Sequence, residues 1–214
     1  MTPQATPRLI PQATPQAVLD FWFLPPSSEG HGKARDAWFR KDARFDAHIA
    51  ERFGAVIAVA LAGGLRAWDA DATHGAHAAQ GSLARILVLD QFTRNALRGT
   101  SASFAGDALA LAAATELEGS GADRTLAPLQ RWFAYLPFEH AENARMQEKS
   151  VTLFADLALE CGEHGGALAG ALDFAQRHRA VIDRFGRFPH RNAILGRAST
   201  ADELVFLSQP GSGF

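Results

Sequence analysis

The sequence has little that would support a disulfide framework, a membrane span or a β-sheet. Cys161 is the single cysteine in 214 residues, which excludes intramolecular disulfides and cysteine-rich zinc sites. No apolar run approaches the ~20 residues that a bilayer span requires. Alternating β-branched runs and Asn-Gly or Asp-Gly hairpin turns are also missing. We therefore expect a soluble helical protein in a reducing compartment, by default the cytoplasm.

The charge balance gives no sign of a nucleic-acid surface, because the formal net charge is -2 and the basic residues are dispersed. The hydrophobic share of 47% and the charged share of 21% are ordinary for a globular protein. We expect a flexible Pro/Gln/Thr-rich leader at residues 1–13, followed by a single helical domain at residues 14–214. Neither a nucleic-acid partner nor a membrane partner is expected, and the sequence does not define an oligomeric state.

Periodic apolar residues predict helices over most of the chain. Thr14, Asp42 and Thr200 are typical helix N-caps, and Thr200 is followed three residues later by the glutamate of a capping box. We interpret Ser82 and Ser103 as the caps of two further helices. Successive helices joined by short Gly/Pro loops favour antiparallel neighbours. The predicted fold is all-α, with antiparallel helix pairs in a compact superhelix or bundle.

Three segments mix charged and polar side chains with aromatic residues. They are residues 135–142, residues 183–192 and residues 90–95, the last at the end of a helix whose earlier turns are apolar. Such a mixture is typical of a polar site held on an apolar scaffold. Because each segment would be costly to bury alone, we predict that the three meet in space.

The residue types in these segments permit two kinds of chemistry. Glutamate and histidine can exchange protons, and arginines can grip an anion through bidentate forks. If the protein is an enzyme, the catalytic candidates are Glu139, His140, Glu142 and His190. The ligand-binding candidates are Asp90, Gln91, Arg94, Asn95, Tyr135, His178, Arg184, Arg187, Arg191 and Asn192.

These residues leave three functions open. The first is a binding module for a small anion or an acidic peptide end, and the second is a hydrolase-like enzyme that uses acid–base or metal-assisted chemistry. The third is a purely structural network of buried ion pairs, with His178 as a bonded core histidine. The histidines and glutamates lack the paired Glu-x-x-His and His-Glu-x-x-His spacings, so we predict no metal site. The sequence does not identify a cofactor.

Four motifs occur in a fixed order along the chain. They are Trp68, residues 83–95 (LARILVLDQFTRN), residues 135–142 (YLPFEHAE), and residues 184–192 (RFGRFPHRN) with Leu195-Gly-Arg197. Together they resemble the bacterial domain of unknown function 924 family, from about Thr14 to the C-terminus. The resemblance implies an all-helical fold similar to the tetratricopeptide-repeat-like superfamily, and it implies no activity.

Two positions depart from that family's pattern. Thr93 stands where proline is usual, so we expect a softer kink or helix end there. Ala141 stands where serine is usual, which removes a possible capping hydroxyl. None of the candidate residues is altered by either change.

Overall fold

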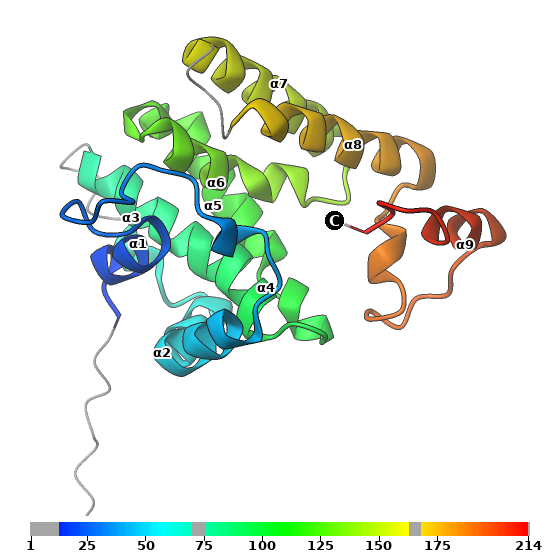
Figure 1. The fold of residues 1–214 in the computed structure, drawn as a ribbon, viewed down its shortest axis with the longest axis horizontal. Coiled ribbons are helices and arrows are strands. Elements are labelled where there is room, and N and C mark those ends of the chain that lie inside the picture. Colours follow the sequence, from blue (N-terminus) through cyan, green and yellow to red (C-terminus); the bar gives the residue numbers. More distant parts are fainter. Residues whose placement is uncertain (1–12, 70–75, 163–167, 214) are drawn as a thin grey trace, which may run out of the picture.

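The computed structural model describes residues 13–69, 76–162 and 168–213, and within these ranges it contains helices and no strand (Figure 1). Residues 1–12 of the predicted leader lie outside the described residues. No helix in the described ranges is long and apolar enough to cross a membrane. The α-helices are α1 (Pro15–Phe23), α2 (Ala43–Leu61), α3 (Ala76–Ile86), α4 (Thr93–Ala96), α5 (Asp107–Gly119), α6 (Pro128–Glu139), α7 (Ala144–Cys161), α8 (Ala169–Phe185) and α9 (Ala201–Leu207).

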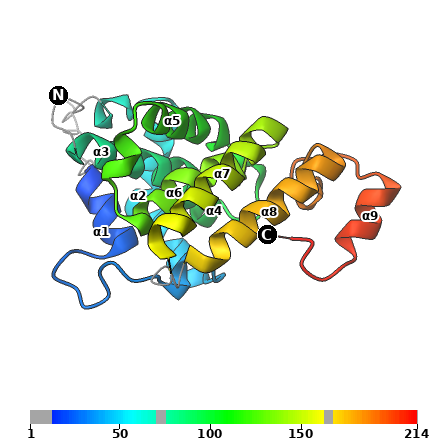
Figure 2. The same cartoon turned by 90° about the horizontal axis from the view of Figure 1, so that it is seen from above.

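Short helical turns connect these helices. The 3₁₀ turns are η1 (Asp36–Trp38), η2 (Arg66–Trp68), η5 (Ser101–Phe104), η6 (Ala122–Thr125) and η9 (Pro189–Arg191), and η4 (Leu87–Phe92) is a π-helix. In space, α6 packs on α7 and α7 packs on α8, while α3 packs on α1 and α5 (Figures 1 and 2). The all-α prediction is therefore confirmed for the described residues.

One apolar core joins most of the helices. Its large, fully buried side chains come from α1 (Trp22), α2 (Phe53), η4 (Phe92), α6 (Phe133) and α7 (Phe154). Burying each such side chain contributes roughly 1.5–3 kcal/mol, so the packing of amphipathic faces stabilises these helices. A smaller apolar cluster holds α9 against the end of α8.

Several of the predicted helix starts are confirmed. The side chains of Thr14, Asp42 and Thr200 each accept backbone N–H groups from the first turn of the following helix. The hydroxyl that Ala141 lacks is not needed for capping, because Asn143 caps α7.

Two predicted caps are wrong. Ser82 lies inside α3, which begins at Ala76, and its hydroxyl donates to Oδ1 of Asp69 at 3.1 Å. Ser103 lies in η5, its hydroxyl donates to the carbonyl of Thr100, and α5 begins only at Asp107. Serine bonds readily to groups outside its own helix, so the residue type alone does not mark a helix start.

The chain continues as a helix through Thr93, where we expected a softer kink or helix end. The π-helix η4 joins α3 to α4, and the Thr93 hydroxyl donates to the Leu89 carbonyl at 2.7 Å. A π-turn is wider than an α-turn. Three consecutive side chains, Asp90, Gln91 and Phe92, are all buried at this point.

Candidate functional site

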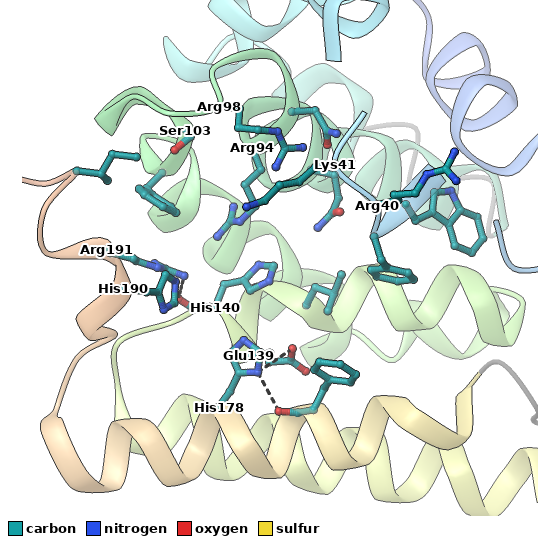
Figure 3. Close-up of a pocket in the computed structure, with 18 of the residues that line it drawn as sticks. Arg40, Lys41, Arg94, Arg98, Ser103, Glu139, His140, His178, His190 and Arg191 are labelled. Atoms are coloured by element: carbon teal, nitrogen blue, oxygen red, sulfur yellow. Dashed lines mark hydrogen bonds and ion pairs between the residues drawn. The ribbon is translucent and has the colours of Figure 1, made fainter. Parts of the chain in front are cut away.

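A cavity of about 740 Å³ is lined by residues of η4, α4, α6, α8, η5 and η9, together with those at and after the end of η1 (Figure 3). This volume lies within the roughly 300–1,000 Å³ typical of small-molecule sites. Most of its wall is apolar, and Phe39 stacks on Trp132 with ring centroids 5.1 Å apart. The aromatic residues of the wall are Trp38, Phe39, Phe104, Trp132 and Phe174.

Basic side chains far outnumber acidic ones in this wall. One carboxyl group, that of Glu139, faces five basic groups and three histidines. In Figure 3, Arg94, Arg98 and Lys41 approach from one side and Arg191 from another. The basic residues are Arg40, Lys41, Arg94, Arg98 and Arg191, and the histidines are His140, His178 and His190.

Arg94 and Arg191 share the carboxylate of Asp107 behind the wall. Nη1 of Arg94 lies 2.9 Å from Oδ1 of Asp107, and Nη1 of Arg191 lies 3.0 Å from Oδ2. Asp107 is the first residue of α5, and Gly106 before it packs closely on η4. A Cβ at Gly106 would lie 2.0 Å from the carbonyl oxygen of Leu89, so a side chain there would push α5 away.

The other three basic groups lie nearer to solvent. Arg98 is paired with Asp46, its Nε lying 2.6 Å from Oδ2. Arg40 and Lys41 are exposed, and no described carboxylate lies within ion-pair distance of either. Positive charge in the wall is therefore only partly offset by the carboxylates behind it.

Asp90 orients His140 from beneath the cavity. Its side chain is fully buried, and Oδ1 lies 2.7 Å from Nδ1 of His140 and 2.9 Å from Nη1 of Arg94. Burial alone would raise the pKa of Asp90, but Arg94 and His140 hold that pKa well below its ordinary value. The pKa of His140 is lowered by burial and by Arg94. At neutral pH the pair is thus a carboxylate bonded to a neutral imidazole.

Glu139 and His178 meet on the opposite wall. Burial, with a contribution from Asp90, raises the pKa of Glu139 to about 8, while burial lowers the pKa of His178 to about 3. Nδ1 of His178 donates to the Phe174 carbonyl at 2.8 Å and lies 3.2 Å from Oε1 of Glu139 (Figure 3). Their contact therefore joins two neutral groups rather than an ion pair. Oε2 of Glu139 is buried and makes no hydrogen bond to any described residue.

His190 stands in η9, directly after Pro189. Burial and the neighbouring Arg191 lower the pKa of His190 to about 4. Although three histidines line the cavity, no group of three or more His, Cys, Asp or Glu among the described residues is placed to hold a metal ion.

The predicted meeting of the three polar segments is confirmed. The backbone N–H of Phe188 donates to Oε1 of Glu142 at 2.7 Å, and Arg191 donates to the carbonyl of His140 at 3.2 Å. The bond between Asp90 and His140 adds the third segment. Eight of the candidate residues line the cavity: Gln91, Arg94, Asn95, Glu139, His140, His178, His190 and Arg191.

The other candidates lie outside the cavity wall and have partners of their own. Glu142 is bound by Arg197, Arg187 by Glu203, and Asn192 by Glu203 and Ser199. The Tyr135 hydroxyl bonds to Asp123 and Arg131, Arg184 lies over the ring of Phe185, and Asp90 lies beneath His140.

One wall of the cavity contains no residue predicted from the sequence. Residues 38–41 (WFRK) mix aromatic and basic side chains, the same signal that identified the other segments, so they could have been found. Asp107 gave no such signal, because it lies in an alanine-rich stretch and its role depends on the close approach of Gly106 to η4.

The family model for "Bacterial protein of unknown function (DUF924)" matches residues 18–211. The chain belongs to this family. A solved structure of a protein of unknown function from Agrobacterium tumefaciens is similar to the DUF924 chain, with 37% sequence identity and a TM-score of 0.73. The similarity covers 91% of this chain and 96% of that one. No protein of curated function matches.

Proposed function

We propose that the cavity binds a small organic anion with an apolar body. The observation that carries this proposal is the composition of the wall, in which five basic groups face one carboxyl group within a largely apolar cavity. Guanidinium groups recognise carboxylates and phosphates through paired N–H donors. A carboxylate or phosphate in the cavity would offset the remaining positive charge of the wall, because Arg40 and Lys41 have no described carboxylate partner. Arg94 and Arg191, whose own charges are balanced by Asp90 and Asp107, would supply N–H donors to the anion.

The apolar wall favours an organic ligand over an inorganic ion. Phe39 and Trp132 are stacked in the wall, and Phe39 is 59% exposed, so its ring is accessible to a ligand. A ring or alkyl group placed there would remove apolar surface from water at roughly 25 cal/mol per Å². The basic groups would then bind the anionic end of the ligand, and the apolar wall would bind its body.

Binding can be tested with phenyl phosphate and inorganic phosphate as probes, by calorimetry and thermal melts. We expect both to bind, and phenyl phosphate to bind more tightly because its ring buries apolar surface. Arg191→Ala should weaken both by about tenfold or more, since charge-assisted hydrogen bonds contribute about 1.5–3 kcal/mol. The variant should lose only about 1–2 kcal/mol of stability, because Asp107 keeps Arg94 as a partner.

Arg184→Ala is the matched control. Arg184 is exposed, lies over Phe185 and does not line the cavity, so its removal changes the net charge equally without altering the wall. Equal probe affinities in wild type, Arg184→Ala and Arg191→Ala, or no binding by the wild type, would contradict the proposal. A large destabilisation of Arg191→Ala without any response to the probes would favour a structural network.

A further inference from the structure

The contact between Asp90 and His140 determines which nitrogen of the imidazole carries a hydrogen. A carboxylate only accepts hydrogen bonds, so the 2.7 Å contact with Oδ1 requires the hydrogen on Nδ1. In a neutral imidazole Nε2 then holds a lone pair, on the part of the ring that is not bound to Asp90. The ring of His140 lines the cavity (Figure 3), so this nitrogen is the one available to a ligand.

We propose that Asp90 and His140 form a general-base dyad that takes a proton from the anion held by Arg94 and Arg191. This inference rests on the proposed function, because the arginines must first hold the ligand beside Nε2. His140 is then the catalytic residue, since it touches the ligand. Asp90 is a positioning residue that holds the ring and stabilises the imidazolium once it forms.

The charged and titratable groups around His140 suit a base. Burial and Arg94 disfavour the imidazolium, whereas Asp90 and Asp107 favour it, and the balance leaves the imidazole neutral at neutral pH. A bound substrate would place further negative charge beside the arginines. The groups that face His140 are Asp90 from η4, Arg94 from α4, Asp107 from α5, His178 from α8, and His190 and Arg191 from η9, and Glu139 precedes it on α6.

The proton transfer balances without a further reactant. A proton leaves an O–H or C–H bond of the bound organic acid for Nε2 of His140, and the electron pair stays on the ligand. Arg94 and Arg191 offset the added negative charge, and Asp90 stabilises the imidazolium. Glu139, whose side chain lines the same cavity, can return a proton to the ligand. The substrate class is a small organic acid that exchanges a proton next to its anionic group.

The dyad can be tested without knowing the substrate. Diethyl pyrocarbonate acylates the unprotonated nitrogen of an accessible histidine, and peptide mass spectrometry reports the rate at each site. We expect His140 to react at Nε2 at least as fast as His48, which is exposed and serves as an internal reference. Two-bond ¹H–¹⁵N spectra of the wild type should show hydrogen on Nδ1. An unreactive His140, or hydrogen on Nε2, would overturn the proposal even if no variant folds.

Asp90→Asn separates positioning from packing. The substitution removes the negative charge of Asp90 but keeps the shape of its side chain. His140 should therefore react about tenfold more slowly, and the midpoint of its pH profile should move to lower pH. An unchanged rate and midpoint in a folded variant would reduce Asp90 to a structural role and contradict the dyad.

Phenyl phosphate distinguishes failure of the dyad from failure of the anion site. Protection of His140 by this probe, together with fast reaction in its absence, supports both proposals. A reactive His140 that phenyl phosphate does not protect would contradict the anion site on which this inference rests. Binding of phenyl phosphate with an unreactive His140 would leave the anion site standing and remove the dyad.

Discussion

Two polar clusters of this protein are built from the same residue types but differ in whether they border a cavity. Around Glu203, Arg187 donates two hydrogen bonds to one carboxylate, which also accepts from Asn192 and from the backbone of Thr200. Around the cavity, Arg94 and Arg191 share Asp107, and Arg94 also pairs with Asp90. Each cluster holds a buried oxygen without a hydrogen-bond partner among the described residues, Oδ1 of Asn192 and Oε2 of Glu139.

The difference separates a structural cluster from a candidate site. The Glu203 cluster closes the last helix onto the segment after α8 and lies outside the cavity wall. The cavity cluster lines an open volume, where Glu139 holds a proton at neutral pH. Arginine, glutamate and asparagine in a motif therefore do not distinguish a structural cluster from a candidate site, whereas the position of the cluster beside a cavity does.

Gly106→Ala should produce the largest effect, because it damages the cavity cluster through the backbone. The added Cβ would meet the Leu89 carbonyl oxygen at 2.0 Å, so α5 must move and carry Asp107 with it. We expect a loss of about 3 kcal/mol or more and weaker binding of phenyl phosphate. Gly54→Ala is the control, since nothing lies within 4 Å of its Cβ inside α2, and it should gain about 0.5–1 kcal/mol. Denaturant unfolding measures both, and equal stabilities would refute the argument.

Glu203→Ala should damage the other cluster alone. Removal of the carboxylate takes away the capping box of α9 and the acceptor for Arg187 and Asn192, which should cost about 2 kcal/mol. The affinity for phenyl phosphate should stay at the wild-type value, because Glu203 does not line the cavity. A marked loss of affinity in this variant would show that the two clusters are not independent.

Glu139→Gln should change how stability depends on pH. The pKa of Glu139 rises from its ordinary 4.5 to about 8 in the folded protein, so between these values the folded state holds a proton that the unfolded state has lost. The free energy of unfolding therefore falls as pH rises across this window, by up to roughly 1.4 kcal/mol per pH unit. The glutamine variant should lack this fall.

Urea melts at several pH values measure that slope. Infrared spectra of the wild type should also contain a protonated-carboxyl band at neutral pH that is missing from Glu139→Gln. If the two proteins show parallel stability curves and the band is absent, Glu139 is ionised and the cavity wall carries a negative charge.

Lys41→Ala should give the smallest effect. Lys41 is exposed at the cavity wall, so it should contribute to attraction of an anion but little to stability. We expect a weakening of phenyl phosphate binding by about threefold at low salt that disappears near 1 M salt. Salt-independent weakening would mean that Lys41 contacts the anion directly.

The sequence was sufficient for the fold class and for much of the site. Apolar periodicity identified the helices, and the mixture of charged and aromatic residues identified segments 90–95, 135–142 and 183–192 before their contacts were known. Arg187 donates hydrogen bonds to Glu203, whereas Arg191 lines the cavity. Sequence spacing could not predict this difference, because it depends on tertiary partners.

The remaining errors have similar causes. Ser82 resembles a cap because the residue type favours that position, yet Asp69, thirteen residues away, provides its partner. Asp107 has no local signal at all, since two arginines from distant segments give it its role. Both cases require knowledge of which segments lie side by side.

The π-helix η4 makes the length of this segment as important as its side chains. A π-turn holds one residue more than an α-turn, so η4 acts as a one-residue insertion in an otherwise regular helix. Because the wider turn takes up the extra residue, the helix beyond it keeps the direction that an α-helix shorter by one residue would give it. Deleting one residue between Leu87 and Phe92 would therefore leave Arg94 facing Asp107 and change which side chains of η4 point inward. A chain with almost the same composition, shorter by one residue here, could keep the cationic wall of the cavity and still lose the contact between Asp90 and His140.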